Sequence, residues 1–305
     1  MHTYVECIPC FLRQTLDVLK RSGSDHRLQE DLLRRVLKLA SEMDLSQPPP
    51  AMAQIINRLV REVTGDPDPY LEVKKRLNGL ALKMLPRMRR RVEDSADRLE
   101  TAVRLAAAGN IIDLGAKSGI AEAEVARALE DSLQAPMNTR AVRDLAQAAG
   151  SARSILYLGD NAGEIVLDRL LVEELGTGKV TFAVRGSPTI NDATMADAAA
   201  TGMTDLVEVI DNGSDAPGTI LGDCSRSFRR NFRDADLVLA KGQGNYETLS
   251  EADRPVFFLL MVKCPVVAAD VGCAPGSLVL RKGAAGKTAA VPRTGSPGSQ
   301  TETGA

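Results

Sequence analysis

Residues 154–164 read SILYLGDNAGE, an apolar run followed by a glycine-containing turn in which an acid and an amide lie side by side. The run Ser154–Leu158 has the composition of a buried strand, and Gly163–Leu175 has the pattern of a helix. Asp160 and Asn161 therefore lie where a strand has ended and a helix is about to begin. This arrangement repeats along the second half of the chain and decides the predicted fold class.

From Ala152 onward, short runs rich in Val, Ile and Leu alternate with helical patterns. The predicted strands are Ser154–Leu158, Val180–Val184, Leu206–Ile210, Leu237–Ala240 and Val266–Ala269. The predicted helices between them are Gly163–Leu175, Asp192–Ala200, Ser225–Arg233 and Pro255–Lys263. Such alternation predicts the α/β class, with a doubly wound, mostly parallel sheet and helices on both of its faces.

The first half of the chain has helical periodicity instead. Apolar residues recur at helical spacing in Leu28–Met43, and a long basic stretch, Tyr70–Arg91, is predicted to be a helix kinked at Pro86. The end of the chain is Gly, Ser, Thr and Pro with hardly a bulky apolar side chain, which is typical of disorder. The predicted domains are a helical domain over residues 1–150, an α/β domain over 151–281 and a disordered tail over 282–305.

The composition argues against nucleic-acid and membrane partners. Aromatic residues make up 3% of the chain with no Trp, so surfaces that stack bases are not expected. A formal net charge of −2 creates no field that favours polyanions or membranes. The longest apolar run, Val256–Val262, is too short to span a bilayer, and the N-terminus lacks the apolar core of a secretory signal. A cytoplasmic location is therefore expected.

Polar side chains follow the first two predicted strands, at the edge where open parallel sheets bind ligands. Asp160 and Asn161 follow the first strand, and Asn191 and Asp192 follow the second within RGSPTINDAT (185–194). Each pair alone is equally consistent with a turn or a helix N-cap. Two such pairs at adjacent strand ends would converge on one crevice, where their oxygens could hold a divalent cation.

A third motif, KGQGNYETL (241–249), follows the fourth predicted strand. Lys241 places a positive charge at the strand end, and the glycines after it expose backbone N–H groups that can line a phosphate site. An acidic metal cluster, a lysine and backbone amides are together what phosphoryl transfer requires. The predicted ligand is therefore a small phosphorylated metabolite, and the α/β domain is predicted to bind metal and phosphate.

These motifs resemble those of a known family. GDNAGE (159–164), RGSPTINDAT (185–194), KGQGNYETL (241–249) and KCPVVA (263–268) are similar to the motifs of the DUF89 family, the damage-control phosphatases. In addition, YVECIPCFLRQ (4–14) and GNIIDLG (109–115) resemble the archaeal and bacterial subfamily that carries a CxxC. The resemblance covers roughly residues 3 to 280 with order and spacing kept.

The resemblance implies an N-terminal helical domain packed on a Rossmann-like α/β/α domain. It also implies a divalent metal, one of Mn, Co, Ni or Mg, held by Asp160, Asn161 and Asp192. A lysine at the position of Lys241 would bind the substrate phosphate. The implied activity is hydrolysis of phosphomonoesters, often of damaged or surplus metabolites.

The hypothesis for the mechanism combines these residues. Asp160, Asp192, Lys241 and Glu164 form the predicted catalytic set, in which Glu164 is a base, a partner of another site residue or a helix cap. The predicted substrate contacts are Lys241, Asn245, Asn110, Asp113 and Arg185. The cation would act as a Lewis acid, and Lys241 would neutralise charge on the phosphoryl oxygens. Direct attack by water and initial attack by Asp160 both stay open.

The cysteines and histidines exclude some chemistry. Five cysteines spread through a chain of this size are not typical of a secreted disulfide framework. Cys7 and Cys10 form a CxxC, for which structural packing, a metal half-site and a redox pair all stay open. The two histidines, His2 and His26, are far in sequence from the acidic motifs, so hydrolase chemistry with a histidine base is not expected.

Three other functions fit part of the pattern. A dehydrogenase or methyltransferase would bind a nucleotide or S-adenosylmethionine at the first turn, but the GxGxxG motif is absent. A haloacid-dehalogenase-like phosphatase would carry Asp-x-Asp after the first strand, whereas position 162 is Ala. A non-catalytic sensor of a phosphometabolite could use the same pocket. The natural substrate, the preferred metal and the oligomeric state, a homo-oligomer included, stay open.

Overall fold

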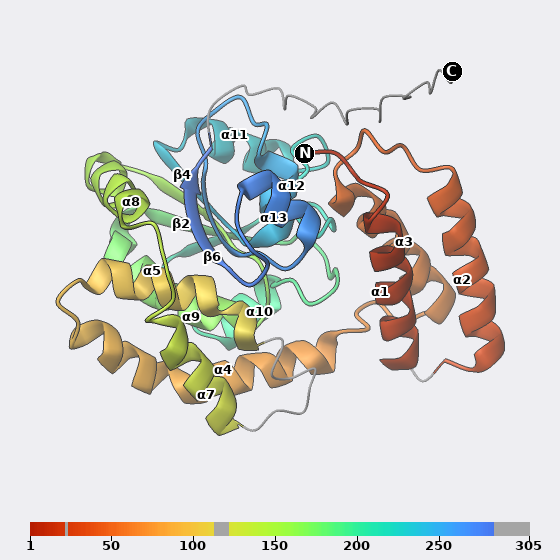
Figure 1. Ribbon diagram of the computed structural model, residues 1–305, viewed down its shortest axis with the longest axis horizontal. Coiled ribbons are helices and arrows are strands. Elements are labelled where there is room, and N and C mark those ends of the chain that lie inside the picture. The colour runs from red at the N-terminus through yellow and green to blue at the C-terminus, as the bar shows by residue number, and fades with distance from the viewer. Residues whose placement is uncertain (22–23, 113–121, 284–305) are drawn as a thin grey trace, which may run out of the picture.

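The computed structural model describes residues 1–21, 24–112 and 122–283, which are built around a six-stranded sheet (Figure 1). Its order is β3-β2-β1-β4-β5-β6. The strands are β1 (Ile155–Leu158), β2 (Val180–Val184), β3 (Glu208–Asp211), β4 (Leu237–Lys241), β5 (Phe257–Met261) and β6 (Leu278–Lys282). Neighbouring strands are parallel except β5 and β6, which are antiparallel. The predicted α/β class with a mostly parallel sheet is confirmed.

Helices cover both faces of the sheet, because alternate residues of a strand point to opposite sides. The helices are α1 (Cys7–Arg21), α2 (His26–Ser41), α3 (Pro49–Thr64), α4 (Leu71–Glu93), α5 (Arg98–Ala108), α7 (Glu122–Ser132), α8 (Thr139–Ser151), α9 (Glu164–Leu175), α10 (Met195–Ala200), α11 (Arg226–Asp234), α12 (Gly242–Leu249) and α13 (Pro265–Val271), with a short 3₁₀ helix at Thr177–Lys179. Ile155 and Tyr157 of β1 pack with α4, α5, α8 and α9 on one face. Leu156 and Leu158 pack with α11, α12 and α13 on the other.

The order of the strands reverses between β1 and β4. The chain first adds β2 and β3 on one side of β1, and then returns to place β4 on the other side. At such a point the loops after the two central strands diverge and leave a crevice at the carboxyl ends of the strands. The turn 159–163 follows β1 and α12 follows β4, so both motifs begin at this crevice.

The helices before β1 belong to two different hydrophobic cores. Helices α1–α3 pack around a core of their own, which includes Phe11, Leu32, Ile56 and Tyr70. Figure 1 shows these three helices together at one side of the molecule, while α4, α5 and α8 share the core of the sheet. The predicted boundary near residue 150 therefore separates the all-helical part of the chain from the part that contains the strands, but it does not separate the hydrophobic cores.

Two predicted elements are wrong, because the predicted helix forms a strand and the predicted strand forms a helix. The helix predicted at Pro255–Lys263 contains β5, and the strand predicted at Val266–Ala269 lies inside α13. The run that forms β5 lies between β4 and β6 and is buried on both faces, so it lacks the alternation of a half-exposed strand. Pro265 occupies the first turn of α13, where its missing N–H costs nothing.

The antiparallel edge strand β6 was not expected from the sequence. It ends at Lys282, where the disordered tail is predicted to begin. Residues 284–305, which carry the rest of that prediction, lie outside the described residues. Within the part of the chain that the structure describes, every helix is too short or too polar to cross a membrane.

Side chains of α3 hold the α1–α3 lobe against the loop that follows β3. Asp215 of this loop accepts hydrogen bonds from Gln54 Nε2 and Arg58 Nη2, each at 2.6 Å from Oδ1, and from Arg61. Burial alone would raise the pKa of Asp215, but the hydrogen bonds from Arg58, Gln54 and Arg61 outweigh it and lower the pKa to about 2. The ionised carboxylate of Asp215 therefore stabilises the contact between helix α3 and the loop that follows β3.

We expect Asp215→Asn to lower the free energy of unfolding by about 1–2 kcal/mol at neutral pH. The folded-state pKa of about 2 lies below the ordinary value of 3.8, so this contribution is complete above about pH 4 and is lost as the pH falls toward about 2. Urea unfolding of both proteins at neutral and acidic pH measures the difference. A difference of the same size at both pH values would contradict the assignment.

Candidate active site

The loops after β1 and β2 meet in the crevice. Asn161 and Asp192 form an isolated antiparallel bridge, which brings the two acid–amide motifs together as the sequence predicts. The residue that caps α9 is Gly163, and Thr194 caps α10 with a capping box. Asp192 lies outside α10, which begins three residues later than predicted. Neither acid–amide pair is a helix N-cap, so that simpler explanation does not apply.

Arg185 lies close to both carboxylates of the crevice. Its Nε donates to Asp192 Oδ2 at 2.6 Å, and its Nη2 is 3.7 Å from Asp160 Oδ1. Its Nη1 donates to Asn245 Oδ1 at 3.3 Å and to Thr219 Oγ1 at 3.4 Å. Its buried Nη2 has no hydrogen-bond partner among the described residues. Arg185 therefore balances part of the acidic charge and keeps one donor group for a ligand.

The two carboxyl groups of the crevice are difficult to ionise. Burial, together with the negative charges of Asp192 and Glu164, raises the pKa of Asp160 well above its ordinary range. Burial also raises the pKa of Asp192, although the ion pair with Arg185 opposes this effect. A bound cation would stabilise both ionised groups, since an opposite charge favours the charged form of a carboxyl group.

Two carboxylates and an amide oxygen suit a hard divalent cation. Asn161 Nδ2 donates to Asp160 Oδ2 at 2.7 Å, to Asn110 Oδ1 at 3.2 Å and to Glu164 Oε2 at 3.3 Å. Because the amide nitrogen faces these three acceptors, Oδ1 of Asn161 remains as the ligand atom. Within the described ranges, no cluster of three or more Asp, Glu, His or Cys residues is arranged as a metal site. An ion held by Asp160, Asn161 and Asp192 would therefore need water or substrate oxygens as further ligands.

Lys241 lies fully buried at the end of β4. Its Nζ donates to Asp168 Oδ1 at 2.5 Å, to Glu164 Oε1 at 2.6 Å and to the carbonyl oxygen of Ala106 at 2.9 Å. Burial would lower the pKa of Lys241, but the charges of Asp168 and Glu164 outweigh it and raise the pKa. All three ammonium protons are engaged. The predicted contact between Lys241 and a substrate phosphate therefore requires that one of these hydrogen bonds be given up.

The remaining predicted substrate contacts have different positions. Asn245 Nδ2 donates to the carbonyl oxygens of Lys241 and Gly159, so its side chain ties the ends of β4 and β1 together. Asn110 accepts from Asn161, and its own buried Nδ2 has no partner among the residues that the structure covers. Asn110 is therefore free to donate to a ligand. Asp113 lies outside the described residues.

Lys263 begins the KCPVVA motif (263–268), but no role in the site was predicted for it from the sequence. It is exposed and follows β5 at the carboxyl edge of the sheet. Burial raises the pKa of Asp160, Asp192 and Glu247, and the positive charge of Lys263 opposes this rise in all three, so Lys263 lies near the acidic crevice. The predicted helix at 255–263 concealed this position. Interpreting the apolar run 256–262 as a strand would have placed Lys263 at a strand end beside Lys241.

Gly242 leaves room for the carboxylate of Asp160. A Cβ atom at Gly242 would lie 2.0 Å from Asp160 Oδ2, and the residue has a φ of +79°, which L side chains rarely adopt. Gly109 packs in a similar way against Glu164, because a Cβ there would lie 2.6 Å from Glu164 Cγ. The crevice therefore depends on glycines that hold two of its acids in place.

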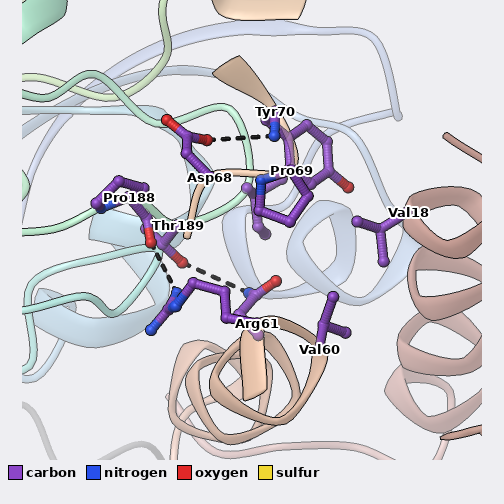
Figure 2. A pocket seen from close by; sticks show the side chains of 10 residues that line it. Val18, Val60, Arg61, Asp68, Pro69, Tyr70, Pro188 and Thr189 are labelled. Carbon is purple, nitrogen blue, oxygen red and sulfur yellow. Dashed lines mark hydrogen bonds between the residues drawn. The ribbon is translucent and has the colours of Figure 1, made fainter. Parts of the chain in front are cut away.

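The turn before Asp192 is strained and anchored on the α1–α3 lobe. Ile190 has a φ of +43°, which is rare for a β-branched residue, and its side chain packs against the core of the lobe. Figure 2 shows the seam beside this turn, where Arg61 Nη1 donates to the carbonyl oxygen of Pro188 at 2.7 Å. A small cavity lies here, lined by Val18, Tyr70 and Ile190 among others. The lobe therefore helps to hold the loop that carries Asp192.

The CxxC motif lies at the start of α1. Cys7 and Cys10 are free thiols, and burial raises the pKa of both, which lowers the fraction of reactive thiolate. In the portion of the chain that is described, no cluster completes a metal site around them. Cys7 is half-buried and packs against the core of α1–α3, whereas Cys10 is exposed, so packing accounts for Cys7 and not for Cys10.

The chain is similar to proteins of one family over nearly its whole length. The model of the damage-control phosphatase ARMT1-like domain matches residues 3–279. A damage-control phosphatase of Archaeoglobus fulgidus is 36% identical, and the match covers 90% of this chain and 97% of that protein. A damage-control phosphatase of Pyrococcus horikoshii is 33% identical, with 92% and 97% covered. The crystal structure of a DUF89 family protein from the same organism matches with a TM-score of 0.85 at 30% identity, covering 93% of this chain and all of that one.

Proposed function

Because the chain belongs to the family of the damage-control phosphatase ARMT1-like domain, we propose that it is a metal-dependent phosphoric monoester hydrolase acting on small phosphorylated metabolites. One observation supports the metal dependence beyond family membership. Asp160 and Asp192 are buried together beside the amide of Asn161, with raised pKa values, at the crevice between β1 and β4. Such a cluster of hard oxygen donors favours a divalent cation.

Within this proposal, Asp160, Asn161 and Asp192 hold the cation. When bound, the cation would supply Lewis acidity to a phosphate oxygen. The buried Nη2 of Arg185 and Nδ2 of Asn110 have no hydrogen-bond partner in the described part of the chain, so both are available to donate to ligand oxygens. Donors of this kind, already oriented in a site with little water, are effective at stabilising charge on a phosphoryl group.

Lys263 supplies the flexible positive charge of the site. It is exposed, whereas the ammonium of Lys241 is engaged by three acceptors beneath the crevice. A lysine at a strand end can neutralise an incoming phosphate and then release the product. The residues of the crevice are nearly all buried, which favours small substrates over polymers.

Phosphate release from a panel of phosphomonoesters tests the proposal. The protein is first freed of metal and then supplied with Mn²⁺, Co²⁺, Ni²⁺ or Mg²⁺. Release that requires a cation and is lost in Asp160→Asn is the expected result. Binding of a phosphorylated metabolite without turnover would favour a sensor, and cation-independent binding of a nucleotide or S-adenosylmethionine would favour a cofactor-binding enzyme.

We expect Lys263→Gln to raise KM for the best phosphomonoester by about 10- to 100-fold, which is the usual loss for a charge-assisted hydrogen bond. Steady-state kinetics and competition by inorganic phosphate measure the change. Lys282→Gln is the matched control, because Lys282 is an exposed lysine on β6 paired opposite Phe257, at the other edge of the sheet. Equal changes in KM for the two substitutions would show that Lys263 does not contact the substrate.

A further inference from the structure

A continuous chain of hydrogen bonds runs beneath the crevice and ends at the candidate metal ligand Asn161. It begins on β1, where the hydroxyl of Tyr157 donates to Asp168 Oδ1 at 2.7 Å. Lys241 Nζ then bridges Asp168 Oδ1 and Glu164 Oε1. The other oxygen of Glu164 accepts from Asn161 Nδ2 at 3.3 Å. Five side chains from β1, α9, β4 and the first turn therefore form one connected network.

This network is shielded from water. Tyr157, Asp168 and Lys241 are 0% exposed and Glu164 is 1% exposed. Glu164 and Asp168 are four residues apart on α9, so both carboxylates lie on the same face of the helix. Gly109 confines Glu164 from the α5 side, because even a Cβ atom there would clash with it. With water excluded, each charged group depends on its partner in the chain for its orientation.

The orientation of the Asn161 amide depends on what surrounds it. Its Nδ2 faces three acceptors, namely Asn110 Oδ1, Asp160 Oδ2 and Glu164 Oε2. Turning the amide over would place Oδ1 against these oxygens, two of which belong to carboxyl groups. Lys241 holds the other oxygen of the Glu164 carboxylate at 2.6 Å, and this hydrogen bond fixes the direction in which Oε2 faces Asn161.

We propose that Asp168, with Tyr157, is a positioning residue for the cation site. Asp168 holds the ammonium of Lys241, and this ammonium fixes the carboxylate of Glu164. Glu164 in turn orients the amide of Asn161 so that its oxygen is left for the cation. The proposal rests on the cation site of the proposed function but not on turnover. It also gives Lys241 a role beneath the site that is consistent with its three engaged protons. Partners of this kind typically change metal affinity by about 10- to 100-fold.

The test is a double-mutant cycle with Mn²⁺ binding as the readout, measured by isothermal titration calorimetry on the metal-free full-length protein. Asp168→Asn should raise the Kd for Mn²⁺ by about 10-fold in the parent. In a Glu164→Ala background the link to Asn161 is cut, so Asp168→Asn should have no further effect. Glu173→Gln, which removes a carboxylate paired with Arg89 near the far end of α9, is the control and should leave the Kd unchanged.

Each outcome decides the proposal. Equal effects of Asp168→Asn in both backgrounds would show that it acts through the fold in general, and no effect in the parent would also overturn the inference. A parent that binds no Mn²⁺ at millimolar concentration overturns it as well. If Asp168→Asn does not fold, Tyr157→Phe removes only one hydrogen bond and should raise the Kd in the same direction. If the Kd values for Mn²⁺ change as expected in the double-mutant cycle but the protein releases no phosphate, the proposed phosphatase activity is wrong and the positioning role of Asp168 stands.

Discussion

Replacing Asp160 with asparagine should abolish phosphate release and, in the cation-free protein, stabilise the fold. Activity is expected to fall by at least about 100- to 1,000-fold, the usual cost of losing one electrostatic contact to the transition state. Stability should rise because burial and the charges of Asp192 and Glu164 make the carboxylate of Asp160 difficult to ionise. An amide of the same shape avoids this cost, since it carries no charge.

The effect of Asp160→Asn on stability should depend on pH with a defined sign. A carboxyl group whose folded-state pKa is raised contributes stability below its unfolded pKa and loses it as the pH rises through the folded-state pKa. The stabilisation by Asp160→Asn should therefore be absent near about pH 3 and grow toward neutral pH. Thermal unfolding of both proteins without divalent cations measures this. Asp215→Asn should act in the opposite direction, because the pKa of Asp215 is lowered.

Two outcomes would contradict the assignment of Asp160. The first is an Asp160→Asn protein that still releases phosphate at a rate close to the parent. The second is a variant that is less stable than the parent at neutral pH without cations, which would mean that the carboxylate is a structural ion-pair partner. Addition of Mn²⁺ separates the two roles further, since it should stabilise the parent and leave the variant unchanged.

Gly242→Ala should displace the carboxylate of Asp160 without changing Asp160 itself. The new methyl group would lie 2.0 Å from Asp160 Oδ2, so either the side chain of Asp160 or the backbone where β4 meets α12 must move. A displacement of the reacting groups by about 1 Å can cost about 100-fold in rate, which is the loss we expect in kcat/KM. The backbone strain at a φ of +79° adds about 1–2 kcal/mol of destabilisation.

Gly272→Ala is the matched control for this substitution. Gly272 has a φ of +81° at the end of α13, and a Cβ there would meet no atom within 4 Å. The control therefore carries the same backbone strain without the clash. We expect it to lower the free energy of unfolding by about 1–2 kcal/mol and to leave kcat/KM unchanged. Equal loss of activity in the two variants would show that strain in the fold, and not contact with Asp160, is responsible.

Local patterns in the sequence were sufficient to predict much of the architecture. The four strands from β1 to β4 have short apolar runs bounded by turns, and the helices between them have their own periodicity, so each element could be located from its own residues. The convergence of Asp160 and Asp192 followed from topology alone, because the carboxyl ends of parallel strands share one edge of the sheet. The bridge between Asn161 and Asp192 brings the two loops together.

The hydrophobic pattern did not identify β5, because a strand that is buried on both faces lacks the alternation of apolar and polar residues. The run of β5 is apolar at every position because both of its faces are buried, with Phe257 and Leu259 in one hydrophobic core and Phe258 and Leu260 in the other. Length alone did not separate this run from a helix. The same error concealed Lys263. The division of the early helices between two cores was also beyond the sequence, because the periodicity of α3 and α4 indicates that each has an apolar face but not which core that face packs against.

The sequence by itself determined that the acid–amide pairs after β1 and β2 gather at the crevice, because that depends on local motifs and on the shared carboxyl edge of parallel strands. Only the tertiary structure decided what each charge does there. Lys241 is engaged by Asp168 of α9 and by the backbone of Ala106 of α5, and neither partner follows from the motif around Lys241. The raised pKa of Asp160 likewise comes first from burial, which is a property of packing among elements that are distant in sequence.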